Sequence, residues 1–136
     1  MNRIIYISMD TLLVPSEKPD LHLGTGISGY AKPFLTWAAD HGRPVILTDG
    51  PLAHAVYLVD KLGAKGKVAV RGFDMNKTDL FTSHDDFYLV DDALIPSEIS
   101  WFTEHGLGHR VIPCGPHGVS ERVRDALHEA ISKHKK

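Results

Sequence analysis

The sequence predicts a doubly wound α/β domain, a three-layer arrangement in which helices cover both faces of a parallel sheet of five strands. Short apolar runs that end in polar residues alternate along the chain with longer segments whose apolar residues recur at helical spacing. Such runs are typical of strands buried on both faces of a parallel sheet, and their alternation with helices is typical of doubly wound folds. The 136 residues suffice for a real core and indicate one domain over 1–136.

Each expected element has its own pattern. The strand over 3–8 has four consecutive apolar residues before the polar Ser8, and similar runs predict strands over 44–48, 67–70, 87–90 and 110–112. Apolar residues at helical spacing, mostly with Pro near the start or Gly after the end, predict helices over 31–41, 51–62, 97–105 and 119–133. A short helix capped by Asn76 is expected before the fourth strand. In the second helix we expect these apolar side chains to face the core: Leu52, Val56, Leu58 and Val59.

Residues 9–29 read as a long irregular connection. They contain Pro15, Pro19 and the glycine-rich run 24–29. A loop of this length in a compact domain is usually functional or mobile. We expect it to lie over the carboxyl end of the first strand, where a lid would sit.

Composition limits the class of protein. A formal net charge of −2 argues against general nucleic-acid binding through a basic face. The single cysteine, Cys114, rules out an internal disulfide and favours a reducing compartment, so we expect a cytoplasmic protein. The apolar run near the N-terminus is too short for a membrane span, and no membrane association is expected. We expect Cys114 to be structural and the cluster His84-Asp85-Asp86 to be a solvated turn.

Polar residues follow the strands at the ends where an α/β sheet places its ligands. Ser8 and Asp10 follow the first strand, Thr48 the second, and Asp91 with Asp92 the fourth. Lys77 precedes the fourth strand. Carboxylates suit Mg²⁺, while a hydroxyl and an ammonium suit phosphate oxygens. If the strand order reverses between the first and fourth strands, these groups converge on one crevice, which predicts a phosphate site with a hard cation.

These motifs, in this order, resemble those of the haloacid dehalogenase (HAD) superfamily, whose commonest members are Mg²⁺-dependent phosphatases. The family's first motif is an apolar strand ending in Asp-x-Asp, often followed by Thr-Leu, and the segment 8–12 reads Ser-Met-Asp-Thr-Leu. Thr48 after PVIL, Lys77, and Asp91-Asp92 after FYLV match the other three motifs. The resemblance covers nearly the whole chain and implies a five-stranded sheet ordered 3-2-1-4-5. The segment 9–29 is too short for a cap domain, so the implied site is open and admits a large substrate.

The resemblance also implies roles for individual residues. The catalytic residues would be Asp10, as the general acid/base, with Ser8 and Lys77. Thr48 and Lys77 would bind phosphate, and Mg²⁺ would be held by Asp91, Asp10 and Asp92. The family's nucleophile is the first Asp of the first motif, and Ser8 stands in its place. A serine hydroxyl is neutral at pH 7, is a poor Mg²⁺ ligand, and has no evident activating base here.

A second registration of the first motif makes Asp10 the nucleophile. Leu12 then replaces the acid, and the strand overruns its expected end by two residues. In either registration one carboxylate of the pair is missing.

Two functions therefore remain open at this point. One is an Mg²⁺-dependent phosphohydrolase or phosphotransferase with weak or unorthodox activity, acting on a phosphorylated small molecule or an exposed phosphate of a macromolecule. The other is a non-catalytic phosphate-ligand binder or protein-interaction module. A phospho-accepting receiver domain fits less well, because its acidic pair follows the first strand.

Overall fold

The computed structural model describes residues 3–74, 76–82 and 86–133. Its main sheet has five strands, all parallel, in the order β5-β4-β1-β6-β7. Their bounds are Ile4–Ser8 for β1, Arg43–Thr48 for β4, Ala69–Gly72 for β5, Phe87–Asp91 for β6 and Val111–Pro113 for β7. The sheet confirms the predicted α/β class with a five-stranded parallel sheet.

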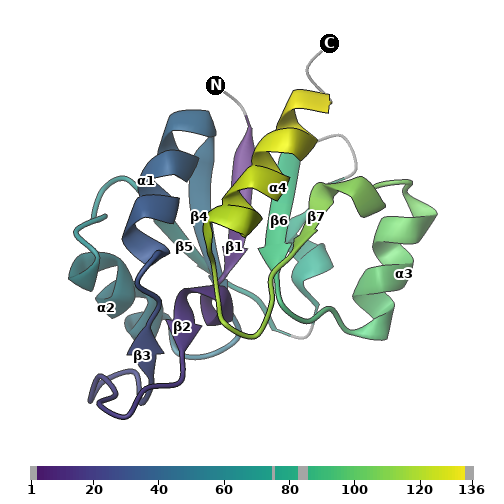
Figure 1. Ribbon diagram of the computed structural model, residues 1–136. Coiled ribbons are helices and arrows are strands. Elements are labelled where there is room, and N and C mark those ends of the chain that lie inside the picture. The colour runs from purple at the N-terminus through teal and green to yellow at the C-terminus, as the bar shows by residue number, and fades with distance from the viewer. Residues whose placement is uncertain (1–2, 75, 83–85, 134–136) are drawn as a thin grey trace.

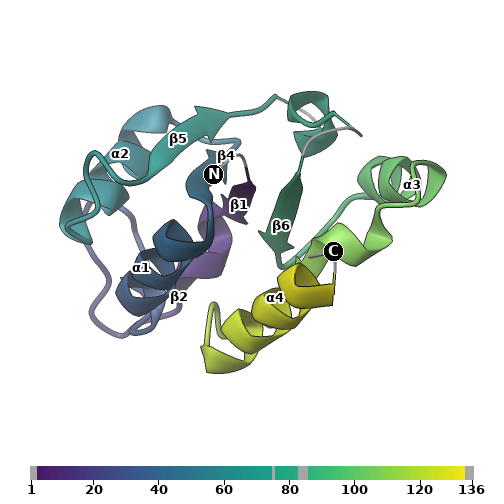
Figure 2. The same ribbon diagram turned by 90° about the horizontal axis from the view of Figure 1, so that it is seen from above.

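Helices cover both faces of the sheet (Figures 1 and 2). The helices α1 (Ala31–His41), α2 (Leu52–Lys61) and α4 (Glu121–Lys133) share one apolar cluster with strand residues such as Ile5 and Ile46. On the other face, α3 (Pro96–Glu104) packs through Phe102 against Tyr6 and Leu89. Successive side chains of β1 alternate between these clusters, as the period of two in a strand requires. Of the helices that the structure describes, none combines the length and the apolarity needed to cross a membrane.

The segment 9–29 is not irregular throughout, contrary to the expectation, because regular elements form near its two ends and residues 15–25 form the loop between them. Directly after β1 the chain forms a short 3-10 helix, η1 (Met9–Leu12), and then an antiparallel hairpin of β2 (Leu13–Val14) and β3 (Gly26–Ile27). The hairpin loop is held beside α2, because the Tyr57 hydroxyl donates a 2.7 Å hydrogen bond to Asp20 Oδ2. This hydrogen bond, and the turn bonds to the other oxygen of Asp20, lower the pKa of that carboxyl.

The loop between β7 and α4 supports η1 from behind. The backbone N–H of Val119 donates to the carbonyl of Thr11 at 2.8 Å. Gly118 has φ +80°, and a Cβ there would lie 2.9 Å from Thr11 O. Glycine is therefore needed at 118 both for its backbone conformation and for this close approach. The Thr11 hydroxyl in turn donates to the carbonyl of Ser8 at 2.7 Å, so this loop helps to fix the end of β1.

Some predicted details differ from the structure. The third strand of the sheet lies two residues later than expected, because Lys67 and Val68 donate their N–H groups to Ala64 O in a turn. Leu52 and Val56 are 51% and 56% exposed, so the prediction that they face the core was wrong. Leu58 and Val59 are buried as expected.

Two further segments complete the described elements. The short helix before β6 is a 3-10 helix, η2 (Lys77–Leu80), and another, η3 (Gly108–Arg110), precedes β7. Asn76 does not cap η2 through its side chain; its Oδ1 instead accepts a 2.6 Å hydrogen bond from the Ser97 hydroxyl. Asn76 therefore links the start of η2 to α3.

Candidate functional site

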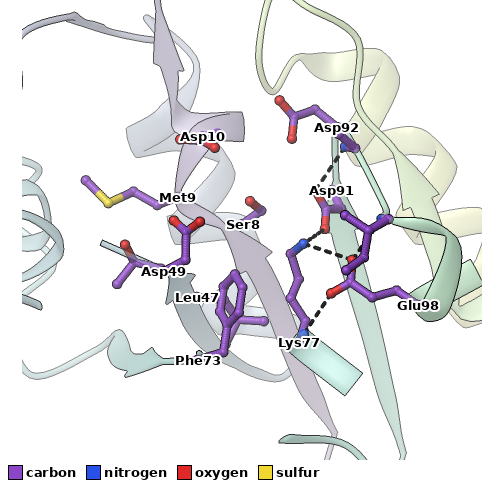
Figure 3. Close-up of a pocket in the computed structure, with 13 residues that line it drawn as sticks. Ser8, Met9, Asp10, Leu47, Asp49, Phe73, Lys77, Asp91, Asp92 and Glu98 are labelled. Atoms are coloured by element: carbon purple, nitrogen blue, oxygen red, sulfur yellow. Dashed lines mark hydrogen bonds and ion pairs between the residues drawn. The ribbon is translucent and has the colours of Figure 1, made fainter. Parts of the chain in front are cut away.

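A pocket of about 240 Å³ opens at the carboxyl ends of the central strands (Figure 3). This is the edge of an open α/β sheet at which ligands bind, at the point where the strand order reverses. Among the residues that line it are all those singled out from the sequence: Ser8, Asp10, Thr48, Lys77, Asp91 and Asp92. No described residue of the β2–β3 hairpin lines the pocket, so the expected lid does not cover it.

Ser8 and Asp10 differ in their placement. Ser8 is the last residue of β1, pairs with Leu47 of β4, and is 6% exposed. Asp10 lies in η1 and is exposed. Leu12 is fully buried in the core and does not line the pocket. Within the described part of the chain, no side chain that could serve as a base hydrogen-bonds to the Ser8 hydroxyl.

Thr48 ends β4, the strand that pairs with β1, and is almost fully buried. Its Oγ1 accepts a 3.1 Å hydrogen bond from the N–H of Gly50, which fixes the hydroxyl at the turn. The O–H of Thr48 remains able to donate to a ligand oxygen. Asp49 follows it and also lines the pocket.

Lys77 and Asp91 form a buried ion pair in a wall of the pocket. The Lys77 ammonium Nζ lies 2.9 Å from Asp91 Oδ2, and both side chains are less than one-tenth exposed. Burial alone would lower the pKa of Lys77, but the charges and hydrogen bonds of Asp91 and Glu98 raise it above its usual value. Burial raises the pKa of Asp91, and Lys77 opposes this rise. The other carboxylate oxygen of Asp91 accepts from the N–H of Ala93 at 3.1 Å.

Glu98 is a site residue that the sequence reasoning missed. It lies in the first turn of α3, is 1% exposed, and accepts a 2.7 Å hydrogen bond from the backbone N–H of Lys77. A local signal was available, since a Glu three residues into a helix often caps its start, and Glu98 Oε1 does accept from the N–H of Ile95. Its contact with Lys77 joins residues 21 positions apart, and no spacing rule indicates such a contact.

The pocket is strongly acidic. Among the described residues that line it, five carry carboxylates and Lys77 carries the single ammonium. Two of the carboxylates pair with this ammonium, whereas Asp10, Asp49 and Asp92 form no ion pair with any described residue. A phosphate dianion alone would be repelled by this excess of negative charge. A divalent cation would remove the repulsion.

The carboxylates that line the pocket are oxygen ligands of the kind that Mg²⁺ takes. No described group of three or more His, Cys, Asp or Glu side chains is gathered in the arrangement of a complete metal shell. Mg²⁺ does not need one, because it keeps several waters and is commonly bound by one or two carboxylates together with ligand phosphates. Asp91, at the end of β6, and Asp10, in η1, both line the pocket. The Asp92 carboxylate lies on the far side of Asp91 from Glu98 (Figure 3).

Cys114 is a structural residue. It is 5% exposed, and its N–H donates to Asp91 O at 2.9 Å. Burial, with the nearby charges of Asp92 and Asp91, raises the pKa of its thiol to about 11, so it is not a nucleophile at neutral pH. Of the acidic cluster before β6, His84 and Asp85 lie outside the described residues, and Asp86 is exposed and pairs with Arg110 at 3.2 Å.

No family model matches the chain. A search of curated proteins likewise finds no match.

Proposed function

We propose that this pocket binds a phosphorylated ligand together with a divalent cation, on a HAD-like frame that has lost its nucleophile. The observation that carries the proposal is the meeting of Ser8, Thr48 and the Lys77–Asp91 pair in one acidic pocket at the carboxyl ends of the strands. The strand order also supports it. When only the strands of the main sheet are numbered in chain order, β5-β4-β1-β6-β7 corresponds to 3-2-1-4-5, the order that the resemblance implies.

Each side chain has a role that its chemistry suits. Asp91 and Asp10 hold Mg²⁺, and the exposed Asp92 at the rim of the pocket is a further carboxylate ligand. The cation supplies the positive charge that lets a phosphate enter an acidic pocket. The Thr48 hydroxyl and the Lys77 ammonium donate to the phosphate oxygens, and the Ser8 hydroxyl adds a neutral donor.

The placement of Ser8 favours binding over turnover. β1 ends at Ser8, and Leu12 is in the core, which supports the registration that sets Ser8 in the place of the nucleophile. A neutral hydroxyl without a base does not attack phosphorus at a useful rate. An exposed pocket without a covering hairpin also leaves bulk water in contact with the bound phosphate.

A second candidate function is weak phosphohydrolysis through Asp10. Asp10 is exposed at the pocket and forms no ion pair with a described residue, so its carboxylate is available as a base for water. The same site would then turn over a phosphate ester slowly, without a covalent intermediate.

Binding is tested first by thermal unfolding in Mg²⁺, in inorganic phosphate, and in both. We expect both together to raise the melting temperature, because a ligand that binds only the folded state stabilises it. Asp91→Asn should abolish this rise. Asp40→Asn, on an exposed carboxylate of α1, should leave it intact. An unchanged melting temperature of the wild type in millimolar Mg²⁺ and phosphate would refute the proposal.

Turnover of an aryl phosphate then separates the two functions. A binder leaves the ester intact in the wild type, while Ser8→Asp gains Mg²⁺-dependent hydrolysis. Hydrolysis by the wild type that Asp10→Asn abolishes would establish the second candidate instead.

A further inference from the structure

Glu98 holds Lys77 at both ends. Its Oε2 accepts from the backbone N–H of Lys77 at 2.7 Å, and its Oε1 lies 3.4 Å from the Lys77 ammonium (Figure 3). Oε1 also accepts from the N–H of Ile95 at 3.1 Å. A single carboxylate thus joins the start of η2, the start of α3 and the charged tip of Lys77.

This arrangement fixes a side chain that is otherwise flexible. A lysine has a four-carbon stem with many rotamers, and ordering it costs conformational entropy. Because the amide and the ammonium of Lys77 both contact the carboxylate of Glu98, the lysine side chain is held at its two ends by one residue. The ammonium is then confined between Glu98 at 3.4 Å and Asp91 at 2.9 Å.

Two of the three contacts that Glu98 makes join backbone segments, and the third reaches the charged tip of Lys77. The two backbone N–H groups that Glu98 accepts already tie η2 to α3, and the link between Asn76 and Ser97 adds to this tie. The third contact reaches the one ammonium among the described lining residues. Glu98 itself also lines the pocket, although it is 1% exposed.

We infer that Glu98 is the positioning residue that sets where the Lys77 ammonium meets a bound phosphate. This inference rests on the proposed function of the pocket. Glu98 acts through Lys77 and not by touching the ligand, so its effect must disappear when Lys77 is absent.

A double-mutant cycle tests this dependence. The measurement is the affinity of the protein for inorganic phosphate in saturating Mg²⁺, by calorimetry. Glu98→Gln should weaken phosphate binding about tenfold, the lower range for a residue behind a ligand-binding side chain. In a Lys77→Met background, Glu98→Gln should have no further effect. Glu104→Gln removes an exposed carboxylate from the same helix and should bind as the wild type does.

The outcomes separate this inference from the proposed function. If the wild type binds no phosphate in Mg²⁺, the proposed function fails, and this inference fails with it. If the wild type binds and Glu98→Gln binds equally well, only the inference fails. An equal loss from Glu98→Gln in the wild-type and Lys77→Met backgrounds would show a structural role and would also overturn it.

A measurement on the wild type covers the case in which Glu98→Gln does not fold. With side chains labelled with ¹³C, adding Mg²⁺ and phosphate should shift the carboxylate signal of Glu98 together with the Cε signal of Lys77. A Lys77 shift with no response from Glu98 would overturn the inference.

Discussion

The ammonium of Lys77 and the carboxylate of Asp91 lie 2.9 Å apart, in a wall of the pocket where neither side chain is as much as one-tenth exposed. Lys77 comes from η2 and Asp91 from the end of β6, so the pair joins a short irregular segment to a central strand of the sheet. With Glu98 behind Lys77, two buried carboxylates face one ammonium. Removing that ammonium leaves both negative charges without a counter-charge.

Lys77→Met is therefore expected to destabilise the protein strongly. Breaking a buried ion pair on one side costs about 3 kcal/mol or more in the free energy of unfolding, because a charge is left uncompensated. Urea unfolding at pH 7 measures this loss. Lys61→Met, on an exposed lysine of α2, should change stability by about 0.5 kcal/mol at most. Adding Glu98→Gln to Lys77→Met should recover part of the loss, and no recovery would contradict this account.

Ser8→Asp should lower stability in the absence of a cation. It adds a carboxylate at a position that is 6% exposed, beside a pocket that already carries an excess of negative charge. Its pKa would be raised by burial and by like charges, so the loss should be small below pH 4 and grow as the pH rises towards 7. Melting temperatures with a chelator, and again with millimolar Mg²⁺, show whether the cation restores stability. Ser8→Asn introduces a side chain of the same size as Ser8→Asp but without charge. Its loss of melting temperature relative to the wild type should depend neither on Mg²⁺ nor on pH.

Cys114 should make stability fall at alkaline pH. Its thiol pKa is about 11 in the folded protein against an ordinary value of 9.0, so the folded state holds the proton more tightly. This contribution is fully present below pH 9 and is lost as the pH rises to about 11; its size is on the order of 2 kcal/mol. Cys114→Ala should unfold in urea with a shallower decline between pH 9 and pH 11. Equal slopes for the variant and the wild type would show that other groups cause the decline.

The two faces of α2 should differ in their tolerance of substitution. Leu58→Ala removes a fully buried side chain and should cost about 2 to 5 kcal/mol in unfolding free energy. Val56→Ala, two positions earlier on the exposed face, should cost about 0.5 kcal/mol or less. Denaturant unfolding of both variants decides the point. A large loss from Val56→Ala would show that this face is covered in solution.

The contrast between the buried Leu58 and the exposed Val56 also shows which features of the fold the sequence could predict. The alternation of apolar runs and helical segments predicted the parallel sheet, because burial on both faces demands such runs. The polar residues after those runs predicted the position of the pocket, because parallel strands end at the same edge. Helical spacing alone could not decide how wide an apolar stripe α2 buries. That width depends on its neighbours, and α2 packs near the sheet edge, over the four-residue strand β5.

Other features depended on contacts between distant segments. The hairpin within 9–29 has strands of two residues each, too short to leave a pattern in the sequence. Glu98 enters the site only through its contacts with Lys77, which lies 21 residues earlier on a separate segment. Sequence patterns indicate residues that act within one helix or strand. They do not indicate a residue such as Glu98, whose role comes from packing between two segments.

The central place of β1 has a consequence for how the protein is made. β1 is synthesised before both of its neighbours in the sheet, and its pairing is complete only after β4 and β6 have left the ribosome. The hydrogen bond between the carbonyl of Thr11 and the N–H of Val119 forms later still, because Val119 lies in the loop after β7. Contacts this far apart in the chain are slow to form. A nascent chain can therefore pair β1 with β4 well before it can pair β1 with β6, and the pocket is completed only once segments that follow β6 have been made.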